Sequence, residues 1–370
     1  MNPFKDIKLG VFEFTLNPKE TLQVPSYNKG NMLRGGFGYA FRNLVCIPQC
    51  LNGSRNLKVA YPCPISTSCP YKIIFEPSPP PNSNHLSKNH DIPRPFVFRP
   101  PETLKNRFDS GEEFRFGLIL IGRALDYLPY FVLSFRELAE GGLGYYPSDS
   151  RRNRGRVKCT LQQVEELNGS RNLQVAKKVY SNEDRLIHPT DGITAGDWIQ
   201  SRLHSLSIDS KDSKDSIGPI DPHDLKSSSI TIRFLTPTYI RESGKVMRDP
   251  RFGSLIKRLR DRLNALSTFF GDGPLDMDFK GMGERAEKIR MVSSGIEWVD
   301  RSRTSSRTHQ HHELSGFIGE AAYEGELNEF LPWLLLGELV HVGKHTAWGC
   351  GRFTIEDTAP SECNKIKNDM

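Results

Sequence analysis

No apolar run in this chain approaches the roughly 18 to 20 residues that a helix needs to cross a membrane. The first residues, Met1 to Lys8, also lack the apolar core of a secretion signal. The chain also lacks a large excess of either charge, because its 50 basic and 44 acidic residues leave a net charge of only +6. That excess permits an anionic partner without demanding one. We therefore expect a soluble protein with no membrane partner.

A disulfide framework is also absent from the pattern of cysteines. The seven cysteines are an odd number at uneven spacing, in a chain without an export signal. We therefore expect them to be reduced and the protein to be cytoplasmic. The 370 residues, 37% hydrophobic and 25% charged, suffice for two domains with separate cores.

The glycine loop, Gly343 to Phe353, is the most informative segment that is present. It is neither a P-loop nor a dinucleotide fingerprint, because both need their glycines after a strand and before a helix. Glycines permit close backbone approach and leave N–H groups free. Lys344 and Arg352 add positive charge, and His345 can move a proton near neutral pH. These properties suit a phosphodiester, although a tight, solvated turn is the plainer alternative.

The spacing of apolar residues predicts the same order of elements twice. In the first half, strands are expected at 9–16, 114–124 and 156–164, with helices at 31–46 and 128–140. In the second half, strands are expected at 229–234, 290–299, 316–324 and 353–357, with helices at 252–270 and 327–341. Two βαββαβ units predict an α+β protein with two tandem ferredoxin-like, RRM-like domains.

The domain boundaries follow from this order and from one change in composition. We expect an N-terminal domain with a cysteine cluster over 1–185, a mobile linker or insertion over 186–228, a C-terminal domain over 229–357 and a tail over 358–370. The linker is predicted from the low-complexity run 209–216, where Asp, Ser and Lys alternate.

Several short motifs occur in an order and spacing that resemble one protein family. They are Leu33-Arg34-Gly35-Gly36-Phe37, Cys69-Pro70-Tyr71, Phe75-Glu76, Leu235-Thr236-Pro237, Ile296-Glu297-Trp298, Arg303-Thr304-Ser305-Ser306-Arg307, Gly316-Phe317-Ile318-Gly319, Leu334-Leu335-Leu336-Gly337-Glu338, Val342-Gly343-Lys344-His345-Thr346 and Gly349-Cys350-Gly351. The series resembles the CRISPR RNA-processing endoribonucleases of the repeat-associated (RAMP) superfamily, most strongly over 290–357. The resemblance implies two ferredoxin-like domains and a glycine-rich loop that contacts RNA.

The resemblance also implies a reaction. CRISPR precursor RNA would be cleaved within the repeat without a metal ion, by attack of the 2′-hydroxyl on the adjacent phosphate. The products would carry a 2′,3′-cyclic phosphate and a 5′-hydroxyl. This chemistry needs a base for the 2′-hydroxyl, an acid for the leaving oxygen and cations for the developing negative charge. CRISPR repeat RNA and subunits of an effector complex are the partners that the resemblance implies.

One departure from the family concerns the catalytic base. Many members carry a catalytic histidine near the first helix, whereas residues 1–84 contain no histidine. Tyr27 and Lys29 lie where family tyrosines and lysines assist. Either these two act alone, or His345 transfers the proton with help from Lys344. His341 is the second histidine here, and we expect it to cap helix carbonyls and to answer the helix dipole.

Contacts to RNA are predicted for basic residues and for the glycine loop. The predicted residues are Arg34, Arg42, Arg301, Arg303, Arg307, Gly343, Gly349, Gly351 and Arg352. Arg301, Arg303 and Arg307 alternate beside a predicted strand and so share one face, which suits a groove that follows the RNA backbone. For each arginine, an ordinary solvated side chain is the alternative.

The cysteines leave a structural metal open. Cys46, Cys50, Cys63 and Cys69 are clustered but lack the paired C-x2-C spacing of a strong zinc motif. Either they bind a structural zinc or they are reduced thiols, and no cofactor is expected in catalysis. Two other functions remain open: a non-catalytic subunit that holds the processed guide RNA end in an effector complex, and a zinc-stabilised interaction module without an RNA role.

Overall fold

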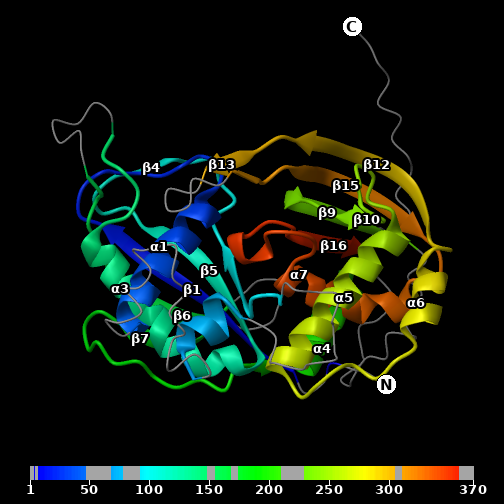
Figure 1. The fold of residues 1–370 in the computed structure, drawn as a ribbon, viewed down its shortest axis with the longest axis horizontal. Helices are drawn as coiled ribbons and strands as arrows, with labels where there is room; N and C mark the ends of the chain where they lie inside the picture. Colours follow the sequence, from blue (N-terminus) through cyan, green and yellow to red (C-terminus); the bar gives the residue numbers. More distant parts are fainter. Residues whose placement is uncertain are drawn as a thin grey trace, which may run out of the picture.

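The structure is a computed structural model in which two α/β units stand side by side (Figure 1). It describes residues 4, 7–46, 68–77, 92–147, 155–167, 174–209, 229–304 and 311–357. No helix in these ranges is long and apolar enough to cross a bilayer.

The first unit is a sheet with two helices on one face. Its main elements are β1 (Lys8–Pro18), α1 (Lys29–Val45), β3 (Phe96–Arg99), β5 (Phe114–Ile121), α3 (Leu128–Gly141), β6 (Cys159–Leu167) and β7 (Val175–Ser181). Its short elements are β2 (Leu22–Gln23), η1 (Tyr71–Phe75), β4 (Arg107–Phe108), η2 (Gly122–Tyr127) and β8 (Ile193–Thr194). The strand order is β3-β5-β1-β6-β7, with antiparallel pairing throughout.

The second unit repeats this topology. Its elements are β9 (Ser229–Thr238), β10 (Arg241–Glu242), β11 (Lys245–Val246), α5 (Phe252–Phe270), α6 (Phe279–Ala286), β12 (Arg290–Val299), β13 (Ser302–Thr304), β14 (His311–Glu313), β15 (Gly316–Glu324), η4 (Asn328–Phe330), α7 (Leu331–Val340), η5 (Thr346–Trp348) and β16 (Phe353–Asp357). The sheet order is β12-β15-β9-β16. In both units the first strand lies between the third and the fourth, which confirms the prediction of two ferredoxin-like folds.

Two parts of the first half differ from the sequence prediction. The strand β3 was not predicted, because its four residues lie between Pro95 and Pro100 and offer no alternation. Within the region 186–228, predicted as a mobile linker or insertion, residues Ala195–Asp209 form the helix α4, which was not predicted. Trp198, Ile199 and Leu203 of this helix are buried. Residues 210–228, like the tail 358–370, lie outside the described residues.

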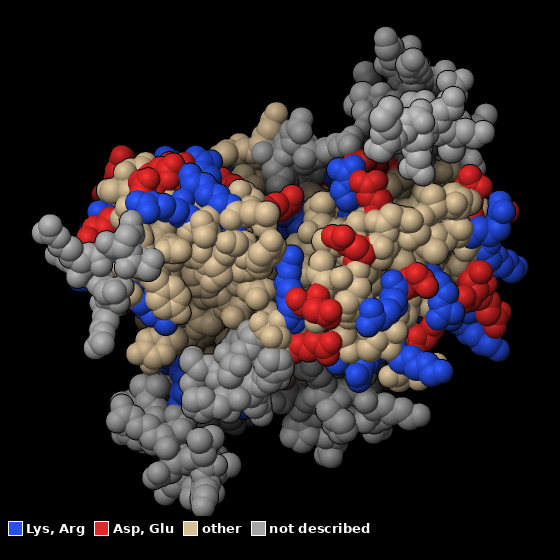
Figure 2. Space-filling model, turned by 90° about the horizontal axis from the view of Figure 1, so that it is seen from above, with Lys and Arg blue, Asp and Glu red and all other residues tan. Residues whose placement is uncertain are grey.

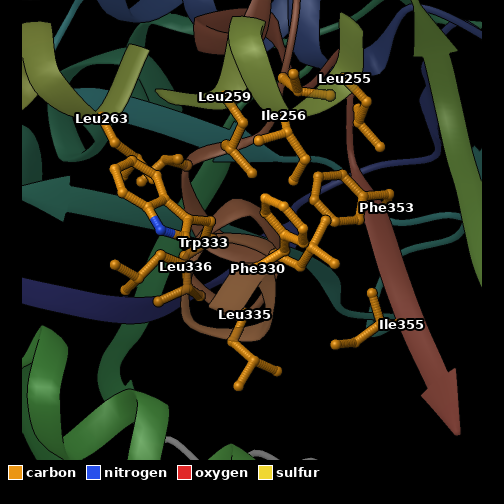
Figure 3. Close-up of a cluster of buried hydrophobic side chains, with 14 of the residues drawn as sticks. Leu255, Ile256, Leu259, Leu263, Phe330, Trp333, Leu335, Leu336, Phe353 and Ile355 are labelled. Carbon is orange, nitrogen blue, oxygen red and sulfur yellow. The ribbon is translucent and has the colours of Figure 1, made fainter. Parts of the chain in front are cut away.

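The two units have different cores. In the first unit, the Phe37 ring lies within 4.5–6.0 Å, centroid to centroid, of six other phenylalanine rings. In the second unit, the cluster in Figure 3 is mainly aliphatic and combines side chains of α5, α7 and β16. Burial of these apolar side chains stabilises both units through the hydrophobic effect.

Buried polar contacts join the units. Arg202 of α4 forms two hydrogen bonds of 2.9 Å to the Glu338 carboxylate of α7. The same carboxylate accepts from the Ile355 N–H (2.9 Å) and the Thr354 hydroxyl (3.0 Å) of β16. Arg99 of β3 donates to the Glu338 carbonyl. One residue of α7 therefore connects α4, β3 and β16.

Candidate functional site

The glycine loop of the second unit lies against the first turn of α1, between the two units (Figure 1). The contact is close enough to require a glycine at residue 30. A Cβ atom there would lie 1.9 Å from the carbonyl oxygen of Trp348. The structure therefore brings together the two segments in which most predicted site residues lie, although they are far apart in sequence.

His345 is held in one orientation at the start of η5. Its backbone is left-handed, with φ 61° and ψ 26°. Its ring stacks on the Trp348 ring, with centroids 4.5 Å apart and planes 5° apart. The His345 carbonyl accepts the Trp348 N–H at 2.9 Å. The imidazole is partly exposed, so it is both oriented and accessible, as proton transfer requires.

Trp348 is a site residue that the sequence did not reveal. Its ring packs against the core of the first unit. The Arg34 guanidinium carbon lies 5.1 Å from the Trp348 ring centroid and 4.5 Å from that of Phe75. Both distances are within the range of a cation–π contact. His345 and Arg34, which come from different units, therefore touch the same indole.

Tyr27 and Arg301 form a second contact between the units. The Arg301 guanidinium carbon lies 4.5 Å from the centre of the Tyr27 ring, and Tyr27 is 50% exposed. The nearby Cys350 is partly buried, and desolvation of its thiol raises its pKa to about 12, while the Arg301 charge acts in the opposite direction. Cys350 is therefore a protonated thiol at neutral pH and no nucleophile.

Lys29 does not lie in the accessible position that the predicted catalytic role requires. It is buried, and its amine donates to the carbonyls of Ser26 (2.8 Å) and Thr103 (2.6 Å). Burial lowers the pKa of the amine. These hydrogen bonds tie the residues just before α1 to the segment that follows β3, so they support a structural role for Lys29.

The predicted cations of the glycine loop are not equivalent. Lys344 is exposed, and its ammonium lies 5.3 Å from the centre of the Tyr239 ring. Arg352 forms an ion pair with Glu102 at 2.5 Å. A carboxylate at that distance competes with a phosphate for the same guanidinium, so Lys344 is the more available of the two.

The remaining predicted arginines are Arg42, Arg303 and Arg307, whose contacts to RNA stay a prediction. Arg42 lies in the last turn of α1, two turns beyond Arg34. Arg303 belongs to β13, but its side chain lies outside the described residues, and so does Arg307.

The glycines of the loop mainly serve the fold of the loop itself. The N–H groups of Gly349 and Gly351 donate to the carbonyls of Thr346 (2.9 Å) and Pro237 (3.0 Å). The expectation that these glycines leave N–H groups free is therefore wrong for both. Gly343 has φ +84°, and a Cβ there would lie 2.4 Å from the Tyr239 carbonyl oxygen. That RNA touches Gly343, Gly349 or Gly351 stays a prediction.

His341 is a buried neutral residue. Burial lowers its pKa well below the ordinary value, and the charges of Arg99, Arg352 and Arg262 lower it further. Its Nδ1 lies 3.1 Å from the carbonyl oxygen of Cys350. The prediction that His341 answers the dipole of α7 as a cation is therefore wrong. Arg99 and Arg262 do so instead, because they donate to the carbonyls of Glu338 and Val340 at the end of α7.

The structure describes two of the four clustered cysteines. Cys69 is buried and Cys46 is partly buried, and both pack against the aromatic core of the first unit. Cys50 and Cys63 lie outside the described residues. The zinc site therefore stays a prediction.

Basic and acidic side chains are interspersed on the face of the molecule seen from above (Figure 2). This agrees with the mild net charge of +6. Binding of an anion at this junction must therefore depend on individually placed cations, since the protein as a whole attracts anions only weakly.

Both halves of the chain match known protein families. Residues 232–353 match the family of the CRISPR-associated endoribonuclease Cas6, and residues 7–192 match a family described as an N-terminal domain. These ranges correspond to the second and first α/β units. No curated protein matches the chain.

Solved structures of Cas6 proteins are similar to this chain at low identity. The Cas6 (TTHB231) product complex, a Thermus thermophilus protein, is 15% identical with a TM-score of 0.47, over 94% of this chain and 99% of that one. A partial Cas6-RT-Cas1–Cas2 complex is 14% identical with a TM-score of 0.46, over 96% and 47%. The Cas6 (TTHA0078) substrate mimic complex is 18% identical with a TM-score of 0.42, over 95% and 99%.

Proposed function

Because residues 232–353 match the family of the CRISPR-associated endoribonuclease Cas6, we propose that the protein cleaves CRISPR precursor RNA within the repeat, without a metal ion. The 2′-hydroxyl oxygen attacks the adjacent phosphorus, and the bond from phosphorus to the 5′-oxygen breaks. A base takes the proton of the 2′-hydroxyl, and the leaving 5′-oxygen takes a proton from an acid. The products carry a 2′,3′-cyclic phosphate and a 5′-hydroxyl.

The observation that carries the proposal is the shared contact of His345 and Arg34 with Trp348. A phosphodiester near this indole would have a proton-transfer group on one side and a guanidinium from the other unit nearby. Cations near the developing charge lower the barrier without changing protonation state. We assign proton transfer to His345, and charge stabilisation to Arg34 and the exposed Lys344.

The contacts of Lys29 favour His345 over a Tyr27–Lys29 pair as the base. To reach a 2′-hydroxyl, the Lys29 amine would have to leave two carbonyl acceptors and a buried position. Tyr27 is half exposed and lies under Arg301, so we assign it to RNA positioning near the reacting phosphate.

The faces of the two sheets give further support for RNA binding at the junction. RRM domains bind single-stranded RNA on aromatic residues of the exposed sheet face. Here the far face of the first sheet is partly covered, because Leu9, Val11 and Ile119 pack in the core shared with the second unit. The outward positions of β9, β15 and β16 include the ion-paired Arg233, Glu320 and Glu356, and none of the described ones is aromatic. The junction remains as the surface suited to RNA.

The test is incubation of the protein with cognate repeat RNA in EDTA. We expect cleavage at one position, with a 5′-hydroxyl on the downstream fragment. His345→Ala should slow cleavage about 10²–10⁴-fold, the usual contribution of general acid–base catalysis. His188→Ala is the matched control, because His188 is an exposed histidine next to Asp184, outside the site. Cleavage by His345→Ala at the rate of this control would remove His345 from the mechanism.

The same experiment distinguishes a second function. Lys29 is engaged in hydrogen bonds and residues 1–84 lack a histidine, so the first unit offers little for proton transfer. A protein that binds the repeat tightly and never cleaves it would be a subunit that holds the processed guide RNA in an effector complex.

A further inference from the structure

A small basic hairpin stands beside the glycine loop. It consists of β10 and β11, paired as Arg241 with Val246 and Glu242 with Lys245. Its two turn residues have positive φ, 48° at Ser243 and 81° at Gly244. Such two-residue turns match the twist of the flanking strands and therefore favour this hairpin connection. A hydrogen bond of 3.0 Å from the Met247 N–H to the Ile240 carbonyl closes its base.

Two aromatic rings orient cations around this hairpin. The Arg248 guanidinium carbon lies 4.7 Å from the Trp298 ring centroid. Arg241 lies 5.8 Å from the Tyr239 ring centroid, and its Nε donates to the Tyr239 hydroxyl at 3.2 Å. Lys344 lies 5.3 Å from the same ring. The two rings are themselves 6.2 Å apart, so the three cations gather around one aromatic pair.

These three cations are exposed and form no ion pair with a carboxylate among the described residues. The nearest acidic groups are engaged elsewhere or exposed. Glu242 pairs with Arg251 at 2.5 Å, and Asp300 accepts the Trp298 indole N–H at 2.8 Å. Asp249 is an exposed carboxylate beside Arg248. Many other basic residues of the protein, such as Arg233 and Arg285, are neutralised by carboxylates.

An arginine stacked on a ring still presents its planar N–H edge to an anion. Its rotamers are already restricted by the ring, so less entropy is lost on binding. The rings are covered by cations and Tyr239 is buried, so they offer no free face for a base. The arrangement therefore suits phosphates rather than bases.

We propose that Arg241, Arg248 and Lys344, called the hairpin site below, bind successive phosphates of a single-stranded RNA segment next to the cleavage site. The identity of the ligand rests on the proposed function. The position of the hairpin supports RNA as the ligand, because the hairpin adjoins the glycine loop: the Lys344 N–H donates to the Tyr239 carbonyl at 3.0 Å. Contacts to the backbone alone carry no sequence information, so this site strengthens binding without selecting the repeat.

The test is the salt dependence of RNA binding by the variant Arg241→Ser/Arg248→Ser. A repeat RNA with a 2′-deoxy nucleotide at the cleavage position serves as the probe, and fluorescence anisotropy gives Kd between 50 and 300 mM salt. Each lost phosphate contact on a single strand lowers the slope of log K against log salt by about 0.7, so two lost contacts lower it by about 1.4. We expect that change, together with Kd raised at least about tenfold at low salt.

The control is Arg258→Ser, since Arg258 is an exposed arginine of α5 that pairs with Asp261. Thermal melting of both variants checks their folding. If the double variant has the slope and Kd of this control, the hairpin site binds no phosphates and the inference is wrong. This outcome is separate from failure of the proposed function, in which the normal protein binds RNA but never cleaves it. A normal protein that binds no RNA overturns both.

Discussion

The two ferredoxin-like units share one topology but use their sheets differently. In the first unit, helices cover one face and part of the other face packs against α4 and the second unit. In the second unit, the outer face carries the ion pairs of Arg233 with Glu320 and Glu356. The first unit therefore serves as a support on which α1 is fixed, and the second supplies the glycine loop. Neither unit holds the candidate site alone.

The cores of the two units also differ, in the kind of side chain that fills them. The Phe37 cluster of the first unit consists of aromatic rings, whereas α5 and α7 of the second contribute mainly leucines (Figure 3). Rings pack with defined geometry and lose little conformational freedom. The aromatic core thus suits the unit whose helix α1 positions Arg34 and receives Trp348.

The largest expected effect comes from breaking the joint between the units at Glu338. In Glu338→Gln, Arg202 remains buried without a charged partner, which typically costs about 3–5 kcal/mol of unfolding free energy. Chemical denaturation would measure this loss. Glu329→Gln is the control, because Glu329 pairs with Arg285 at the surface and should contribute less than about 1 kcal/mol. Equal losses in the two variants would show that the buried network does not join the units.

The second prediction moves the glycine loop without removing a chemical group. In Gly30→Ala, the new methyl group would overlap the Trp348 carbonyl and force the loop away from α1. A displacement of about 1 Å can reduce a rate about 10²-fold, and single-turnover cleavage would measure it. Gly35→Ala is the matched control in the same helix, since a Cβ there meets nothing within 4 Å. It should instead stabilise the protein by about 0.5–1 kcal/mol. Normal cleavage by Gly30→Ala would mean that the loop need not touch α1.

The smallest expected effect concerns the pH dependence of stability at His341. Its pKa is lowered in the folded state, so the unfolded chain takes up a proton at a higher pH. The stabilisation is complete above about pH 6.5 and is lost as the pH falls toward the folded pKa. Each unit of pH in that window costs at most about 1.4 kcal/mol. Denaturation of the normal protein and His341→Gln between pH 8 and 5 would show it, as a difference that shrinks toward acid pH. A constant difference would mean that His341 is not neutralised by its surroundings.

Much of the fold was predictable because its elements are long and periodic. The helix 252–270 and the strands 290–299, 316–324 and 353–357 have the predicted bounds. The helix α4 was not predicted, because Trp198, Ile199 and Leu203 stand among polar residues and become a core only against α7. Its Trp198 indole donates to the Leu335 carbonyl at 3.0 Å. A partner of that kind cannot be read from a local pattern.

The candidate site was predictable in part for the same reason. His345, Lys344 and Arg34 stand in motifs that the sequence displays, and the structure brings them to one junction. Trp348 was missed because an aromatic residue between glycines has no distinctive spacing, and its role depends on α1. Lys29 was assigned by its position near Tyr27, whereas its buried acceptors, Ser26 and Thr103, come from the folded chain.

The contact between Gly30 and Trp348 also sets the order of events during synthesis. The ribosome makes α1 before the glycine loop, with about 300 residues between them. At about 5–20 residues per second, an interval on the order of half a minute separates them. During that time the nascent chain has half of the site and no partner for it. A chain released before residue 348 would therefore lack the contact between Gly30 and Trp348 on which the proposed cleavage depends.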